Sequence, residues 1–232
     1  MKNEITMIAD THGFMPDDID PTKLLIHAGD ITGDGSMLEL RLMCEWMSRQ
    51  PADHVVAVAG NHDISVERFN QGARKIFKEY GITYLQNEWA EVAGYKIYGT
   101  PMSLNFGNWS FMGTEEELKD IFKRVPDDCD IVISHGPPHG VLDLVPRGEN
   151  TGSRAALFEL ICRVGPRLFV CGHIHEQHGV LKLDMGTACI NASVGPYSEI
   201  KNGRRALKRG PVRTLPEGWY DLLYPKNNEE EE

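Results

Sequence analysis

The sequence predicts a layered α/β protein with mixed β-sheets, and three observations support this fold class. Short apolar runs rich in β-branched residues alternate along the chain with stretches in which apolar residues recur at helical spacing. Polar residues and glycine directly follow several of these runs, as expected where buried strands end at a sheet edge. Two short runs separated only by Ala93-Gly94 indicate an antiparallel hairpin, so the strands cannot all be parallel.

The first half of the chain predicts strands joined by helices. Buried strands are expected over Glu4 to Ala9, Lys23 to Ala28 and His54 to Ala59. Between the second and third of them, Ser36 to Arg49 carries an apolar face long enough for a helical crossover between parallel strands. A second helix is expected over Ser65 to Tyr80, because apolar residues keep helical spacing there until Gly81.

The second half predicts a hairpin, two more strands and two more helices. Thr114 followed by Glu117 is the pattern of a capping box, which opens a helix that should run to about Arg124. The other elements expected are hairpin strands over Trp89 to Val92 and Tyr95 to Tyr98, strands over Asp130 to Ser134 and Leu168 to Cys171, and a helix over Ser153 to Val164. Since no internal repeat or low-complexity linker occurs, we expect a single domain over 1–223 and a disordered acidic tail over 224–232.

Composition disfavours several classes of protein. An apolar fraction of 41% and a charged fraction of 25% are typical of a globular protein. The net charge of −10 argues against sequence-independent binding of DNA or RNA. The basic segment 201–213 is interpreted as a solvated loop, with a phosphate-binding patch as the alternative.

Five cysteines without a C-x-x-C pair suggest neither a disulfide framework nor a thiolate zinc site. No signal-peptide core or membrane span is evident, so a cytoplasmic location is expected.

Five polar clusters each follow the end of an expected strand. They are Asp10-Thr11-His12, Gly29-Asp30, Gly60-Asn61-His62-Asp63, Ser134-His135-Gly136 and Gly172-His173-Ile174-His175. In α/β sheets, ligands bind at the edge where the strands end. Taken alone, each cluster is more often a turn former or a helix cap than a set of ligands. Together they supply carboxylate, carboxamide and imidazole donors, which suit divalent ions such as Mn²⁺, Fe²⁺ and Zn²⁺. The sequence therefore predicts a metal site.

These clusters resemble the signature of the calcineurin-like metallophosphoesterase superfamily, which reads D-x-H, G-D, G-N-H-[DE], a strand-end H and G-H-x-H in this order. The resemblance extends from about Ile5 to Val194 and implies a four-layer αββα sandwich with mixed β-sheets. Within the superfamily, the chain is most similar to the metallophosphoesterase-domain (MPPED) branch of class III phosphodiesterases. The residues that carry this second likeness are Asp10-Thr11-His12-Gly13, Ser134-His135-Gly136-Pro137-Pro138, Gly172-His173-Ile174-His175-Glu176 and Asn191-Ala192-Ser193.

The same resemblance implies two divalent metal ions. We expect Mn²⁺, with Fe²⁺ or Zn²⁺ as alternatives, because nitrogen donors make up a large part of the site. The implied ligands are Asp10, His12 and His175 for one ion, Asn61, His135 and His173 for the other, and Asp30 as a bridge between both. A water or hydroxide shared by the ions is the implied nucleophile. His62 is implied to protonate the leaving oxygen as general acid, with Asp63 orienting its ring. Some relatives in the branch replace one His of G-H-x-H with Gly, whereas both are present here, so full metal occupancy is expected.

The function implied by the resemblance is hydrolysis of small phosphodiesters, cyclic nucleotides in particular. The residues themselves indicate only phosphoester hydrolysis, so a phosphomonoesterase or a protein phosphatase using the same site remains an alternative. A noncatalytic nucleotide-binding scaffold is a further alternative, against which the complete ligand set and His62 argue. A nuclease is disfavoured, because the chain is short, acidic and without an evident DNA-reading module. No membrane partner is expected, and the oligomeric state stays open.

Several other basic side chains are interpreted as lying outside the site. Structural or solvated roles are preferred for His27, His54, His139 and His178. Arg147 and Arg154 flank a loop over 148–152 between two of the metal clusters. We interpret both as surface arginines, with contact to a substrate phosphate as the alternative.

Overall fold

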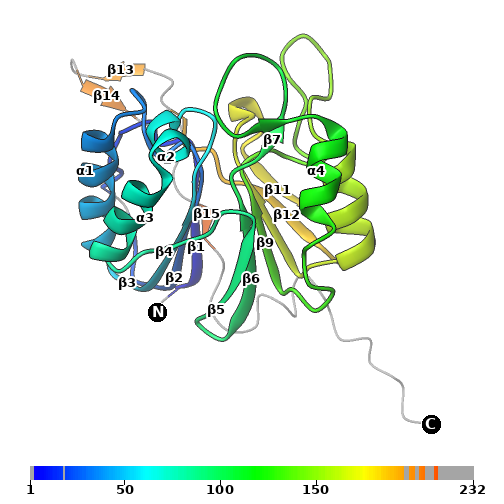
Figure 1. The fold of residues 1–232 in the computed structure, drawn as a ribbon, viewed down its shortest axis with the longest axis horizontal. Coiled ribbons are helices and arrows are strands. Elements are labelled where there is room, and N and C mark those ends of the chain that lie inside the picture. The colour runs from blue at the N-terminus through cyan, green and yellow to red at the C-terminus, as the bar shows by residue number, and fades with distance from the viewer. Residues whose placement is uncertain (1–2, 18, 196–198, 202–203, 207–211, 214–232) are drawn as a thin grey trace.

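The computed structural model describes residues 3–17, 19–195, 199–201, 204–206 and 212–213 of the chain (Figure 1). The tail expected over 224–232 lies outside these residues, as does most of the basic segment 201–213. Within the described ranges, none of the helices combines the length and apolar character needed to cross a membrane. Two β-sheets lie face to face, and helices cover the outer face of each sheet (Figure 1).

The first sheet has five strands in the order β15-β1-β2-β3-β4. Its strands are β1 (Asn3–Ile8), β2 (Thr22–Ala28), β3 (Ala52–Val58), β4 (Thr83–Tyr84) and β15 (Val212–Arg213). Strands β1 to β4 are parallel, and β15 pairs antiparallel with β1. The outer face of this sheet is covered by α1 (Met37–Ser48), α2 (Ile64–Arg68) and α3 (Asn70–Glu79). The expected βαβ unit, with α1 as the crossover between β2 and β3, is therefore confirmed.

The second sheet has six strands in the order β11-β12-β10-β9-β6-β5. Its strands are β5 (Glu88–Val92), β6 (Tyr95–Thr100), β9 (Ile131–Ser134), β10 (Leu168–Cys171), β11 (Gly179–Lys182) and β12 (Ala188–Asn191). The central strands are parallel, whereas β5 and β11 run antiparallel to their neighbours. The expected hairpin and the expected mixed character of the sheets are both confirmed.

Two helices cover the outer face of the second sheet, namely α4 (Glu115–Phe122) and the π-helix η1 (Ala156–Val164) (Figure 1). The capping box predicted for α4 is present, since Thr114 and Glu117 exchange hydrogen bonds between side chain and backbone. Two short strands, β7 (Ser103–Leu104) and β8 (Met112–Gly113), pair parallel to each other, and η2 (His175–Gln177) is a single 3₁₀ turn. A separate hairpin is formed by β13 (Glu199–Lys201) and β14 (Arg204–Ala206).

Side-chain alternation along the strands separates the apolar layers. Leu24, Ile26 and Ala28 of β2 lie in the layer between the two sheets, together with Val170 of β10. Leu25 belongs instead to the layer between the first sheet and its helices. Because successive side chains of a strand point to opposite faces, one continuous apolar run serves both layers. This is why Leu24, Leu25 and Ile26 follow one another in the predicted strand without a polar residue between them.

A third apolar layer lies between the second sheet and its helices. Phe169 of β10 and Tyr98 of β6 are buried there with Phe122 of α4 and Leu160 of η1. The order of layers is thus helices, sheet, sheet, helices, which confirms the expected four-layer αββα sandwich. Three apolar layers between four layers of backbone give rigid support to the loops at the sheet edges.

One helix differs from its prediction. The stretch Ser65 to Tyr80 forms two helices, α2 and α3, because the backbone at Phe69 leaves the helical region with φ −121° and ψ 44°. The Phe69 side chain, which the helical spacing would place on the buried face, is 53% exposed. The following Asn70 donates a side-chain hydrogen bond to the carbonyl of Val66 in α2, over 3.4 Å. An Asn side chain that bonds to nearby backbone competes with the hydrogen bonds of a continuous helix, and the Asn70 contact lies at the break.

Candidate metal centre

The polar clusters of the sequence meet at the edge where the two sheets come together. The backbone of Ala9, just after β1, donates to the carbonyl of Ala192 over 2.9 Å and accepts from Val194 over 2.9 Å, so the last residues of β1 join the strand end of β12. The His135 ring, which follows β9, contacts the carbonyl of Ala28 at the end of β2 over 3.0 Å. These contacts fix the strand ends of one sheet against those of the other.

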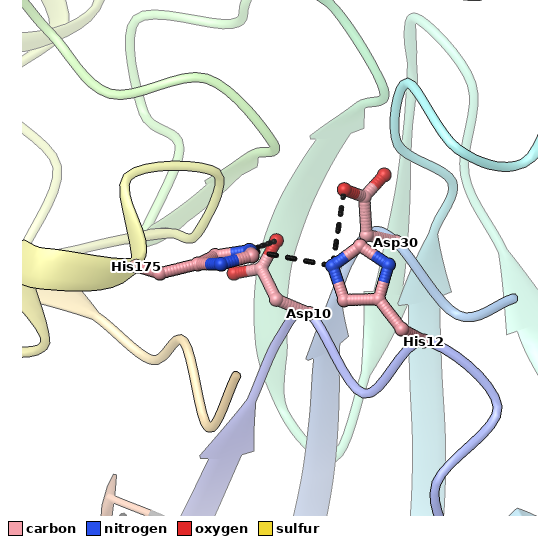
Figure 2. A group of neighbouring side chains, drawn as sticks. All are labelled: Asp10, His12, Asp30 and His175. Carbon is pink, nitrogen blue, oxygen red and sulfur yellow. Dashed lines mark hydrogen bonds and ion pairs between the residues drawn. The ribbon is translucent and has the colours of Figure 1, made fainter. Parts of the chain in front are cut away.

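Four of the predicted side chains converge from three different loops (Figure 2). One possible ligand atom from each of Asp10, His12, Asp30 and His175 lies within 4.8 Å of the others. The Nε2 atoms of His12 and His175 are 3.3 Å apart. His12 Nε2 is 3.7 Å from Asp30 Oδ2, and His175 Nε2 is 3.5 Å from Asp10 Oδ1. Two imidazole nitrogens and two carboxylates facing one point form a set of donors that suits a divalent cation.

The other three predicted ligands lie beside this cluster. Nε2 of His135 is 3.0 Å from Oδ1 of Asn61 and 3.4 Å from Oδ1 of Asp30. The His173 ring lies 5.0 Å from the His135 ring, between ring centroids. The backbone N–H of His173 donates to the Asp10 carboxylate over 2.9 Å, which connects the two groups. All seven residues predicted as ligands are therefore brought into one continuous group.

Asp30 lies between the two groups and presents a different oxygen to each. Its Oδ2 faces His12, and its Oδ1 faces His135. The side chain is 2% exposed, and the neighbouring imidazoles outweigh the effect of burial and lower its pKa below the usual range. Asp30 is thus a buried anion that faces one group of donors with each oxygen, an arrangement that suits a bridging ligand.

The loops that carry these side chains adopt unusual backbone conformations. Asp10, His12, Asp30 and His173 have φ of 55°, 46°, 52° and 67°, in the left-handed region that non-glycine residues rarely occupy. Each such residue typically costs about 1–3 kcal/mol and persists only where its surroundings impose it. Backbone bonds between the loops do so here, since Asp10 N donates to Gly29 O and His12 N donates to Asp30 O. The strain turns the side chains toward a common centre.

Glycine is required at the third strand end because the Asp30 carboxylate approaches the backbone there. A Cβ atom at Gly60 would lie 2.3 Å from Oδ1 of Asp30 and 2.7 Å from Cε1 of His135. Contacts that short are not found for real side chains, so the G-N-H-D cluster needs its glycine for space. Gly60 therefore leaves room for the Asp30 carboxylate and the His135 ring.

The electrostatics of the site favour bound positive charge. Burial lowers the pKa of His135, but the Asp30 carboxylate more than offsets this and raises the pKa to about 9. The pKa of His175 is also raised, since Asp10 outweighs the effect of burial. Burial lowers the pKa of His173 to about 3, so its ring is neutral and able to bind a metal ion. The site therefore attracts cations while keeping a neutral imidazole donor.

His62 lies next to both groups with its backbone fixed and its ring between two aromatic neighbours. Its N–H donates to Asp30 Oδ1 over 2.8 Å. The ring centroid is 4.5 Å from that of His12 and 4.5 Å from that of Trp109. His62 is partly exposed, so solvent or a ligand has access to it. This position fits a proton donor that is not itself one of the ligands.

The Asp63 carboxylate makes different contacts from those expected. Oδ1 accepts from the backbone and hydroxyl of Thr32 over 2.8 and 2.7 Å, and Oδ2 accepts from the N–H groups of Gly60 and Ile31 over 2.8 and 3.1 Å. Within the described residues it makes no hydrogen bond or ion pair with the His62 ring. Burial, and then the charge of Asp30, raise its pKa to about 6. The geometry favours a positioning role for Asp63, acting through the loops instead of through the ring.

Two residues that support these loops could not be given a role from sequence. Asn191, buried at the end of β12, donates its amide to the carbonyl of Ile174 over 2.9 Å and so supports the loop between His173 and His175. Glu39, at the start of α1, accepts from the backbone of Gly33 and Asp34 over 2.8 Å each. The sequence around Asn191 and Glu39 does not point to such roles, because an Asn after a strand and a Glu in the first turn of a helix are common for other reasons.

The other basic residues have mixed outcomes. The His27 ring is buried with Nε2 2.9 Å from the Thr11 hydroxyl, and Nδ1 of His178 is 2.8 Å from the carbonyl of Ser193. Arg147 lines a pocket that also reaches His173, whereas Arg154 lines a different pocket. The buried and hydrogen-bonded His27 fits the structural role expected of it, and of the two arginines Arg147 shares a pocket with a predicted ligand.

Comparison with known proteins adds a family and a fold. Residues 4–177 match the model of the calcineurin-like phosphoesterase family. Metallophosphoesterase domain-containing protein 1 of Homo sapiens is 33% identical over 211 residues, which cover 81% of this chain and 64% of that protein, and the Mus musculus protein gives the same values. UPF0046 protein K07C11.7 of Caenorhabditis elegans is 33% identical over 203 residues, covering 82% of this chain and 69% of that protein.

A solved structure shares the fold at low sequence identity. The protein TT1561 of Thermus thermophilus superposes with a TM-score of 0.57 at 14% identity, over 84% of this chain and 90% of that one. This likeness supports the arrangement of layers alone. The chain spans slightly less than two thirds of the length of its human and mouse relatives, at 64%.

Metal binding at the centre is predicted to depend on pH. Because the pKa of His135 is about 9 without metal, its ring is protonated at neutral pH and must lose the proton before Nε2 binds an ion. Raising the pH from 6 to 9 should tighten Mn²⁺ binding, by up to about tenfold per pH unit for each proton displaced. Calorimetric titration in buffers of different ionisation enthalpy measures the protons released. An affinity independent of pH, with no proton release, would contradict this account of the site.

Proposed function

The chain belongs to the calcineurin-like phosphoesterase family, and from that membership we propose that it is a two-metal phosphodiesterase acting on small phosphodiesters, cyclic nucleotides in particular. The observation that carries the two-metal proposal is the placement of Asp30, with one oxygen toward His12 and the other toward His135. A single-ion site would not need both oxygens of a buried carboxylate turned to separate groups of donors. The preference for diesters rests on the likeness to the MPPED branch.

In this proposal the donors divide around Asp30. The first ion is held by Asp10, His12, Asp30 and His175, and the second by Asp30, Asn61, His135 and His173. When bound, the two ions supply a water of lowered pKa and positive charge against the phosphoryl oxygens. Mn²⁺ is our preferred metal, with Fe²⁺ or Zn²⁺ as alternatives, because imidazole makes up much of the donor set and Mg²⁺ favours oxygen-rich shells.

The residues of this chain then have distinct tasks. Nδ1 of His135 is held at the carbonyl of Ala28, which leaves Nε2 directed toward Asp30 and Asn61. Such a backbone contact fixes the ring orientation and tautomer of a metal-binding histidine. His62 is proposed to protonate the leaving oxygen, since its ring is partly exposed beside the first group while its backbone is anchored on Asp30.

A substrate panel tests the proposed activity. Protein loaded with Mn²⁺ should hydrolyse a cyclic nucleotide and bis(p-nitrophenyl) phosphate faster than p-nitrophenyl phosphate. Exhaustive chelation should abolish turnover, and Mn²⁺ should restore it better than Mg²⁺. Preference for the monoester would support a phosphomonoesterase, and failure on every substrate would favour a noncatalytic scaffold. Full turnover in protein shown to be free of metal would exclude the mechanism.

The role of His62 is tested by the leaving group. His62→Ala should keep its metal content and lose about 10² or more in kcat on a cyclic nucleotide, whose leaving alkoxide is strongly basic. On bis(p-nitrophenyl) phosphate the loss should be much smaller, because a nitrophenolate departs with little need of a proton. His54→Ala, a change at an exposed histidine of β3, is the matched control and should leave both rates unchanged. Equal losses on both substrates would refute the acid role.

A further inference from the structure

The segment between β7 and β8 places two exposed aromatic side chains beside the candidate metal centre. Phe106 is 60% exposed and Trp109 is 43% exposed. The Phe106 ring lies 5.2 Å from the His173 ring, and the Trp109 ring lies 4.5 Å from the His62 ring, both between centroids. Aromatic rings left in water next to a polar site leave apolar surface available for binding. The two rings approach different parts of the centre.

Trp109 and Phe106 each contact a different histidine of the site, and each of these histidines contacts a further one. Trp109 contacts His62, which in turn contacts His12 of the first group. Phe106 contacts His173, which in turn contacts His135 of the second group. The proposed acid His62 marks the side from which the leaving group departs. The Phe106 side is therefore available to the substituent that stays on the phosphorus.

A pocket of about 720 Å³ opens on the Phe106 side. This volume lies within the range of about 300–1,000 Å³ that is usual for small-molecule sites. The residues that line it are Leu104, Asn105, Phe106, Val145, Pro146, Arg147, Asn150, Thr151, His173, Ile174 and Glu176. His173 connects the pocket directly to the candidate centre, so a group held there can remain bonded to a phosphate at the metals.

The lining indicates the chemistry of this group. Leu104, Val145, Pro146 and Ile174 give apolar walls around the Phe106 ring. The charged side chains of the lining are one cation, Arg147, and one anion, Glu176, and Arg147 is ion-paired with Glu149 over 2.8 Å. With charges of opposite sign, the lining has no excess of positive charge to attract a second phosphate. An uncharged, flat aromatic group fits better than a polyphosphate.

We propose that this pocket binds the retained organic substituent of the phosphodiester, an aryl ring or nucleobase that stacks on Phe106. The inference rests on the proposed phosphodiesterase function and names the class of substrate that the site selects. Stacking of a base on an aromatic side chain typically changes affinity by roughly 5- to 150-fold. In a cyclic nucleotide both ester oxygens belong to one sugar, so the base is the part that enters the pocket.

Two diesters that differ only in the retained group test this inference. Both p-nitrophenyl phenyl phosphate and p-nitrophenyl methyl phosphate lose p-nitrophenolate, and only the first retains a ring. In the full chain loaded with Mn²⁺, Phe106→Ala should lower kcat/KM for the phenyl diester about tenfold or more, mainly through KM. For the methyl diester kcat/KM should change less than about twofold, and Phe106→Tyr should keep the preference for the phenyl diester.

The control variant is Phe158→Ala. Phe158 is 61% exposed on η1 and lines a different pocket with Glu115 and Arg154, so this change removes an equally exposed ring elsewhere. It should leave both diesters unaffected. No loss in Phe106→Ala, or an equal loss on both diesters, would overturn the inference, since the second result would mean that Phe106 acts on the centre itself.

A binding measurement separates failure of this inference from failure of the proposed function. Calorimetry with Mn²⁺-loaded protein should show tighter binding of phenyl phosphate than of methyl phosphate, and Phe106→Ala should remove the difference. If the wild-type protein hydrolysed neither diester but kept this binding preference, the proposed function would fail and the pocket assignment would stand. Equal binding of both monoesters by the wild-type protein would overturn the assignment.

Discussion

The buried carboxylate of Asp30 is the group on which the rest of the site depends. It accepts a hydrogen bond from His62, faces His12 with one oxygen and His135 with the other, and is 2% exposed. Withdrawing such an anion from water costs several kcal/mol unless cations or donors surround it. The raised pKa of His135 shows that this anion favours a positive charge beside it. The proposed pair of divalent ions would supply more positive charge than a proton does.

The sandwich supplies the rigidity that this arrangement needs. Left-handed backbone at Asp10, His12, Asp30 and His173 is unfavourable in isolation, and it is imposed by bonds between loops that start from neighbouring strand ends. The two sheets meet through an apolar layer, and backbone bonds from Ala9 to Ala192 and Val194 join them at the site. Since each candidate ligand group draws on loops of both sheets, any loosening between the sheets would separate the donors. Stability of the fold and geometry of the centre are therefore linked.

Most of the strands, the start of α4 and the polar clusters could be predicted from sequence, because each is marked by residues that are neighbours along the chain. Continuous apolar runs give the strands, the Thr114 and Glu117 pair gives the start of α4, and each polar cluster follows a strand end directly. The break at Phe69 was not predicted, because helical spacing continues through it. The backbone angles at Phe69, the Asn70 contact and the exposure of the ring reveal it only in the structure. The contacts of Asp63 and the positions of Phe106 and Trp109 also required the structure. These contacts and positions depend on which loops lie next to one another in the fold, and the spacing of residues along the chain does not predict that.

The central claim is that Asp30 bridges two ions, and metal content per chain tests it most directly. The native protein, Asp30→Ala and His175→Ala would be loaded with Mn²⁺, passed through a desalting column and analysed for metal by mass spectrometry. We expect about two ions per native chain, loss of both in Asp30→Ala and retention of about one in His175→Ala, because a bridge serves two ions and a terminal ligand serves one. Unchanged metal content in Asp30→Ala would contradict the account.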